Sequence, residues 1–214
     1  MFSFSIVLTI YIGFIHAFEA DHLLAVSNIV SQRSSLLQSI KDGMVWGLGH
    51  ATTIVLIGII ALLLKVKVSP HYFHYLEALV GIMLIVLGAY RLITLYRTFA
   101  VPNNTLHNSS SKNTTLKNTH ALSYSVGLVH GIAGSGELIL LTMLQFKSAY
   151  TGIVYLIVFA TGAIAGMMVA AAACSIPFYK KLVATTNIQL VLKIASALLC
   201  IGYGFYVLYK NTMY

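Results

Sequence analysis

The chain has 214 residues, of which 58% are hydrophobic and 8% charged, whereas a soluble domain carries about 25% charged residues. This composition excludes a soluble globular protein and predicts a chain that lies almost wholly within a lipid bilayer. The net charge of +8 does not indicate a nucleic-acid partner, because most Lys and Arg lie between apolar segments, where they orient a membrane protein.

Six apolar segments are long enough to cross a bilayer, since about 20 helical residues span its ~30 Å hydrocarbon core. They cover residues 3–29, 43–65, 72–96, 121–144, 150–175 and 188–209. We therefore expect an all-α fold, a polytopic membrane protein with six transmembrane helices in a single membrane domain, residues 1–214. The first segment reads as a retained membrane helix, because it has no basic leading region and no small-residue cleavage site.

Residues 99–120 are polar, rich in Asn, Ser and Thr, and without a hydrophobic period, which predicts a flexible loop. Nine Lys and Arg residues flank the first, third and fifth loops, against four on the other side. Because basic residues favour the cytoplasmic face, this loop is expected to be cytoplasmic and both termini outside the cell membrane.

A weak internal repeat relates the two parts of the chain on either side of this loop. Gly13-Phe14-Ile15-His16 matches Gly127-Leu128-Val129-His130. Halves of three helices each, residues 1–98 and 121–214, would be inverted in the membrane, a common plan of secondary transporters. The alternative is a chance match between apolar segments.

The strongest chemical signal is a cluster of four ionisable side chains inside the first segment: His16, Glu19, Asp21 and His22. A charge at the bilayer centre costs at least ~2.5–3.5 kcal/mol, so these groups are expected to face a polar cavity, pair or bind an ion. Imidazole and carboxylate are suitable ligands for Ni²⁺, Co²⁺ and Zn²⁺, whereas Cu(I) prefers thiolate, and Mg²⁺ and Ca²⁺ prefer oxygen.

On an ideal helix His16 and His22 lie about 9 Å apart along the axis, too far to share one ion held at ~2.1 Å. Either the helix is broken near Gly13–His22, or the residues serve successive positions on a path. A helix end lying among lipid headgroups is the alternative, which the apolar residues on both sides disfavour.

Further candidates lie in two glycine-rich stretches. His50 follows Gly47-Leu48-Gly49, and His130 and Glu137 lie within residues 127–137, whose glycines suit a broken helix beside a cavity. Each histidine has an alternative reading as a packing residue satisfied by the backbone. We expect the remaining groups to be interfacial or without a role: His71, His74, Glu77, Trp46, Arg91, His107 and His120.

These motifs resemble the nickel/cobalt transporter family, whose hallmark is H-x4-D-H, here His16, Asp21 and His22. GLGHATTI around His50 is similar to a second family element. GLVHGIAGSGEL, residues 127–138, is closer to the six-helix urease-accessory (UreH-like) branch than to the eight-helix permeases. The resemblance implies a permease for Ni²⁺ or Co²⁺, often linked to urease or hydrogenase maturation.

The sequence thus favours a transporter without a bound cofactor, with metal contacts from His16, Asp21, His22, His50, Glu19, His130 and Glu137. In this hypothesis two inverted halves rock around the site during uptake. A divalent-metal exporter of the same superfamily is an alternative. A membrane metalloenzyme with Glu19 as general base has less support, because H-E-x-x-H and repeated histidine boxes are absent.

Overall fold

The computed structural model describes residues 2–33, 35–64, 70–100, 120–133, 148–179 and 186–213. Every regular element within these ranges is helical, which confirms the all-α prediction. The elements are α1 (Phe2–His16), α2 (Ala20–Val30), α3 (Leu36–Leu64), α4 (Pro70–Ala100), α6 (Ala149–Ser175), the short 3-10 helix η1 (Ile176–Phe178) and α7 (Thr186–Thr212). A further helix covers residues 120–133.

Four described helices, α3, α4, α6 and α7, are long and apolar enough to cross a bilayer. The pair α1 and α2 meets the same test as one span bent by 58°. The predicted segment 121–144 is described only as far as residue 133, so the sixth span stays a prediction. Large apolar side chains such as Leu56, Val86 and Leu199 are exposed along these helices, as expected of surfaces that face lipid.

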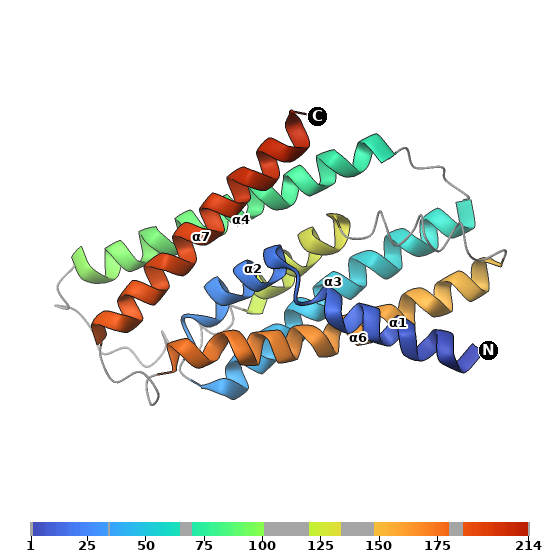
Figure 1. Cartoon of the computed structure of the whole chain (residues 1–214), viewed down its shortest axis with the longest axis horizontal. Coiled ribbons are helices and arrows are strands. Elements are labelled where there is room, and N and C mark those ends of the chain that lie inside the picture. Colours follow the sequence, from blue (N-terminus) through green and yellow to red (C-terminus); the bar gives the residue numbers. More distant parts are fainter. Residues whose placement is uncertain are drawn as a thin grey trace.

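The helices pack in two groups with α2 between them (Figure 1). In one group α6 packs along both α3 and α1, and in the other α4 packs along α7, while α2 contacts α4, α6 and α7. The helices alternate in direction, so α2 and α4 end where α3 and α7 begin, at the left of Figure 1. We call this the basic end because Arg33, Lys41, Arg97 and Lys193 lie near these helix ends in the sequence.

Glycines allow the helix at 120–133 to lie against α3 with almost no space between the backbones. A Cβ atom on Gly127 would overlap the carbonyl oxygen of Trp46, and one on Gly49 would overlap that of Tyr124. Such small residues let helices approach closely in a bilayer, where van der Waals packing drives association. This packing brings His50 of α3 close to the helix that carries His130.

A buried ion cluster lies at the basic end. Asp42 of α3 is 1% exposed, and its carboxylate accepts hydrogen bonds from Nε of Arg33 and, at 2.7 Å, from Nη2 of the same residue. Nδ1 of His120 lies 2.8 Å from Asp42 Oδ1 as an ion-pair contact. Neither residue was predicted from the sequence to have a structural role: Asp42 was not singled out, and His120 was expected to have none. The cluster ties the segment after α2 and the start of the 120–133 helix to α3.

Replacing Gly127 by Ala should destabilise the protein by about 1–3 kcal/mol, because overpacking forces the two backbones apart. The matched control is Gly202→Ala, where an added Cβ meets nothing within 4 Å. Thermal melting of both variants in the same detergent measures the difference. Equal melting temperatures would show that the contact between α3 and the 120–133 helix is not as close as described.

Replacing Asp42 by Asn should lower stability more strongly, by about 3–5 kcal/mol, because it leaves the buried Arg33 cation uncompensated. Lys41→Gln removes a charge from the neighbouring exposed position and should have little effect. Chemical denaturation in mixed micelles compares the two variants, and an Asp42→Asn protein as stable as Lys41→Gln would contradict the structural role of the cluster.

Candidate metal centre

The first span is broken between α1 and α2. Helix α1 ends at His16, and Glu19 adopts an extended backbone conformation (φ −63°, ψ 153°) before α2 begins at Ala20. The Glu19 N–H donates to the His16 carbonyl oxygen at 3.1 Å, which closes the last turn of α1. The break brings the rings of His16 and His22 to 4.7 Å between centroids. One of the two expectations for this segment, a broken helix, is therefore confirmed.

The break, together with close packing of α3 and the 120–133 helix, gathers four histidines from different elements. The His50 ring lies 5.4 Å from both His16 and His22, and the His130 ring lies 4.5 Å from His22. Two overlapping sets have potential ligand atoms within 4.8 Å of one another, and both include His22. The sets are His16, His22 and His50, and Asp21, His22 and His130.

These spacings are close to those of a metal site. An ion held at ~2.1 Å by two imidazole nitrogens places those nitrogens at most about 4.2 Å apart. Each set therefore needs side-chain shifts of under about 1 Å to enclose an ion. Within the described residues neither cysteine belongs to a set, so the two sets offer only imidazole nitrogens and a carboxylate.

Three of the imidazole rings are oriented by a hydrogen bond that Nδ1 donates to an oxygen atom. His16 Nδ1 donates to Glu19 Oε1 at 2.7 Å, and His22 Nδ1 donates to Asp21 Oδ1 at 3.0 Å. His130 Nδ1 donates to the Val126 carbonyl oxygen at 3.2 Å. This is the arrangement that fixes the tautomer and raises the basicity of metal-binding histidines, because it leaves Nε2 as the free electron-pair donor.

The opposite nitrogens of these rings make no described hydrogen bond, and the nearest described charged group to His130 Nε2 is Asp21 Oδ2 at 3.8 Å. Nε2 of His16, His22 and His130 has no hydrogen-bond partner among the described residues, and neither does either nitrogen of His50. The exposed fractions of His22, His50 and His130 are 2% or less. Buried polar atoms are normally hydrogen-bonded, so such a group of unpaired nitrogens fits a cation that binds between them.

Trp46 forms one wall of the centre. Its indole ring is fully buried and lies 5.4 Å from the His22 ring and 5.8 Å from the His130 ring. The prediction that Trp46 is an interfacial anchor was therefore wrong. Position in α3 explains the difference, since the helix begins at Leu36 rather than near residue 43, which moves Trp46 almost three turns into the span.

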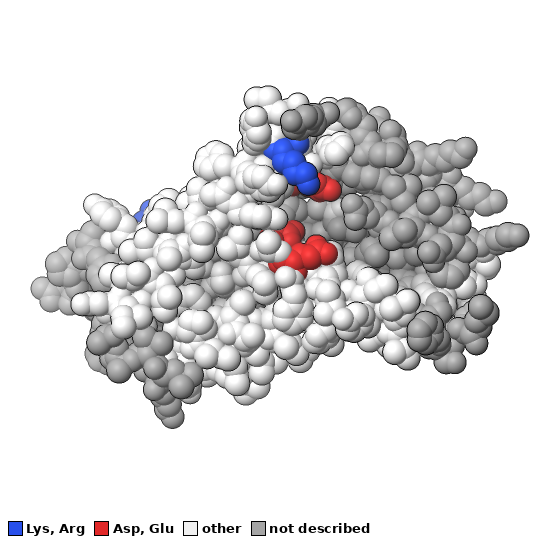
Figure 2. Space-filling view, in the orientation of Figure 1, with Lys and Arg blue, Asp and Glu red and all other residues white. Residues whose placement is uncertain are grey.

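A cavity of about 660 Å³, which we call the metal cavity, leads from the end opposite the basic end to the histidines. Its lining includes His16, His22 and His130 but not His50. It also includes residues of α4 and α7, among them Glu77, Tyr203 and Lys210. Figure 2 shows acidic side chains gathered in a hollow at the middle of the face, with basic atoms at its rim. Acidic walls in a cleft raise the local concentration of cations.

The other ionisable residues named from the sequence lie in different places relative to the two ligand sets. Glu19 contacts His16, but its side chain is 56% exposed and it belongs to neither ligand set. Glu137 lies outside the described residues. Glu77, expected at the interface, lines the cavity, whereas His74 lies away from both sets and its Nδ1 donates to Asn211 Oδ1 at 3.1 Å.

The chain matches no protein-family model and no solved structure. It is 36% identical over 169 residues to the urease accessory protein UreH of Bacillus sp. (strain TB-90), and the alignment covers 78% of this chain and 74% of UreH. It is 27% identical over 204 residues to the Chloroplast protein FOR GROWTH AND FERTILITY 2 of Arabidopsis thaliana, of which the alignment covers 53%. A second Arabidopsis thaliana protein, Chloroplast protein FOR GROWTH AND FERTILITY 1, is 28% identical over 166 residues, with 45% of its length covered.

The UreH alignment extends over most of both chains at more than a third identity. It agrees with the motif resemblance around His16, Asp21 and His22, and with the apolar helices that carry these residues. The chain therefore belongs to the UreH-like branch of the nickel/cobalt transporter family.

Proposed function

We propose that this protein is a secondary transporter that takes up Ni²⁺ or Co²⁺ across the cell membrane. The observation that carries the proposal is the group of buried imidazoles whose unpaired nitrogens face one another. Neutral imidazole nitrogens bind first-row divalent ions, and a carboxylate beside them adds charge compensation. A passing cation is the substrate that would repay the desolvation of these groups.

The cavity suggests how the ion reaches the histidines. Carboxylates of Glu19, Asp21 and Glu77 attract the hydrated cation into the cavity from the end predicted to face outside. The imidazoles then replace part of its water shell. Because His22 belongs to both ligand sets, the ion moves from one set to the other without leaving a ligand. Such shared, incomplete sites favour passage over tight retention.

The helix pairs suggest which parts move. Each close pair, α3 with α6 and α4 with α7, takes one helix from each predicted half of the chain. Rocking of residues 1–98 against 121–214 would separate both pairs. We propose instead that the α4–α7 pair moves relative to the group containing α3 and α6, with α2 at the boundary. This motion would close the cavity at one end and open a path toward the basic end.

The membrane potential supplies a sufficient driving force for uptake. An elementary charge gains about 2.3 kcal/mol per 100 mV, so a divalent cation gains about twice that on entering a negative interior. The relative in Bacillus is named a urease accessory protein. We propose that the imported metal here likewise serves the maturation of a nickel enzyme such as urease or hydrogenase.

The same geometry bears on two alternative functions, an exporter and a metalloenzyme. An exporter would use the same ligands, and only the direction of transport separates it from an importer. A metalloenzyme with Glu19 as general base has less support, because this carboxylate already accepts a hydrogen bond from His16 and orients that ring.

Changing either His16 or Asp21 of the first motif should strongly reduce uptake. In cells that express the protein, His16→Ala and Asp21→Asn should reduce accumulation of radioactive Ni²⁺ and Co²⁺ at least about tenfold, since even indirect partners of metal ligands contribute that much. His74→Ala, a histidine outside both ligand sets, is the matched control and should retain uptake. Faster loss of preloaded metal from wild-type cells would overturn uptake and favour export.

Two of the three carboxylates that line the cavity, Glu19 and Glu77, should differ in their effect on metal affinity. Glu19→Gln removes the acceptor that orients His16 and should weaken Ni²⁺ binding about 10–100-fold. Glu77→Gln makes the same change in charge, but no described hydrogen bond joins Glu77 to a histidine, so its effect should be smaller. Calorimetric titration of the protein in lipid nanodiscs compares them, and equal losses would mean that both act only through charge.

A further inference from the structure

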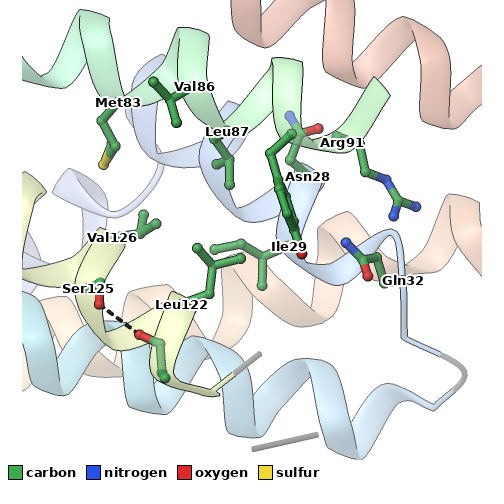
Figure 3. Close-up of a pocket in the computed structure, with 12 residues that line it drawn as sticks. Asn28, Ile29, Gln32, Met83, Val86, Leu87, Arg91, Leu122, Ser125 and Val126 are labelled. Atoms are coloured by element: carbon green, nitrogen blue, oxygen red, sulfur yellow. Dashed lines mark hydrogen bonds between the residues drawn. The ribbon is translucent and has the colours of Figure 1, made fainter. Parts of the chain in front are cut away.

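A second cavity, of about 570 Å³, lies between α2, α4 and the 120–133 helix and shares no lining residue with the metal cavity. We call it the Arg91 pocket. Figure 3 shows Asn28, Gln32 and Arg91 at one end of it and the apolar side chains of Met83 and Val86 toward the other. Its volume is within the ~300–1,000 Å³ range of ligand pockets. One end is thus polar, and most of the wall is apolar.

Arg91 is buried, and no described carboxylate serves as its counter-ion. Its exposed fraction is 4%, and its described hydrogen bond is a long one, 3.4 Å from Nη2 to the Ser31 carbonyl oxygen. Nε has no partner, and within the described residues no carboxylate forms an ion pair with this guanidinium. The prediction that Arg91 reaches the cytoplasmic surface was wrong. A buried, unpaired guanidinium is costly unless an anion binds it, and its planar donors suit phosphate.

A second unpaired atom lines the same end of the pocket. Asn28 is 2% exposed, and its Nδ2 donates to the carbonyl oxygens of Leu24 at 3.1 Å and Ser196 at 3.2 Å. These bonds fix the amide so that Oδ1 is the remaining acceptor, and Oδ1 has no partner in the described residues. The pocket therefore offers a buried cation and, beside it, an acceptor for a hydroxyl group.

The chemistry of the lining excludes the metal as its ligand. Among the described residues no His, Asp or Glu lines the Arg91 pocket, and the guanidinium repels a divalent cation. A small soluble anion would leave the apolar wall without a partner. An amphiphile with an anionic, hydroxyl-bearing head satisfies both ends at once, because its chain covers the apolar wall while its head pairs with Arg91.

We propose that the Arg91 pocket binds an anionic glycerophospholipid. The phosphate pairs with Arg91, a headgroup hydroxyl donates to Asn28 Oδ1, and an acyl chain lies along Met83 and Val86. The expected depth of Arg91 in the membrane agrees with a lipid headgroup at this position. Helix α4 has 31 residues and is about 46 Å long, so in a centred ~30 Å hydrocarbon layer Arg91 lies within about 6 Å of the boundary. Basic pockets between membrane helices bind such headgroups.

Native mass spectrometry of the full-length protein tests the proposal with phosphatidylglycerol as the probe and phosphatidylcholine as the zwitterionic comparison. The wild type should bind phosphatidylglycerol at least about tenfold more tightly than phosphatidylcholine. Arg91→Gln should remove this preference, so that the two lipids bind with about equal affinity. The matched control, Arg97→Gln, removes the same charge from an exposed position on the same helix and should retain the preference. Inorganic phosphate should not compete at millimolar concentration.

A second variant separates lipid binding from folding. Val86 is 62% exposed, so Val86→Trp should fill the apolar wall without disturbing the core and should lower phosphatidylglycerol binding while leaving Arg91 intact. The Val86→Trp variant tests lipid binding in the pocket even if Arg91→Gln fails to fold. Equal loss of preference in the Arg91 and Arg97 variants, or unchanged binding in Val86→Trp, would overturn the proposal, and competition by inorganic phosphate would reassign the site to a soluble anion.

Discussion

The imidazole nitrogens that face one another in the interior of the helix bundle are the constraint on which the rest of the structure depends. Each of these nitrogens would bind water if it were exposed, yet it makes no hydrogen bond to any residue that the structure describes. A fold that gathers four such rings, with exposed fractions at or near zero for three of them, is costly unless a cation compensates for it. The break in the first span and the glycines of α3 and the 120–133 helix both serve this gathering.

The charged side chains differ between the two ends of the molecule. The metal cavity is lined by Lys210 and by three of the carboxylates of the chain, and it opens at the end where α4 begins. At the basic end, Arg33 is neutralised by Asp42, whereas Arg91 has no carboxylate partner among the described residues. The proposed cation path and the proposed lipid site therefore lie in different parts of the molecule, and the orientation of the two ends in the membrane stays a prediction.

Much of the centre was predictable from the first motif alone. Charged side chains within an apolar run have few physical explanations, so the sequence alone proposed His16, Asp21 and His22 as metal ligands, and the structure brings these side chains together. The sequence also limited the geometry, because a straight helix separates His16 from His22, and a break was one of two solutions. Which solution holds depends on packing of α1 and α2 against other helices, and no proline or glycine lies between residues 17 and 19 to signal it.

Errors arose where burial depends on where a helix begins. Trp46 and Arg91 were expected at interfaces because tryptophan and arginine favour them, yet tertiary packing buries both. Asp42 was overlooked because the second span was expected to begin after it, whereas α3 begins at Leu36. Its partner His120 is 78 positions away in the chain, and a contact at that separation has no signal in a single sequence. Six spans and an inverted repeat stay predictions, since part of the fourth segment lies outside the described residues.

X-ray absorption spectroscopy of the protein loaded with Ni²⁺ in a lipid bilayer tests the central claim most directly. The account predicts an ion bound by nitrogen and oxygen at about 2.1 Å, with the outer scattering of at least two imidazole rings and no sulfur ligand. A spectrum with sulfur in the coordination shell, or with water oxygens alone and no imidazole scattering, would contradict it.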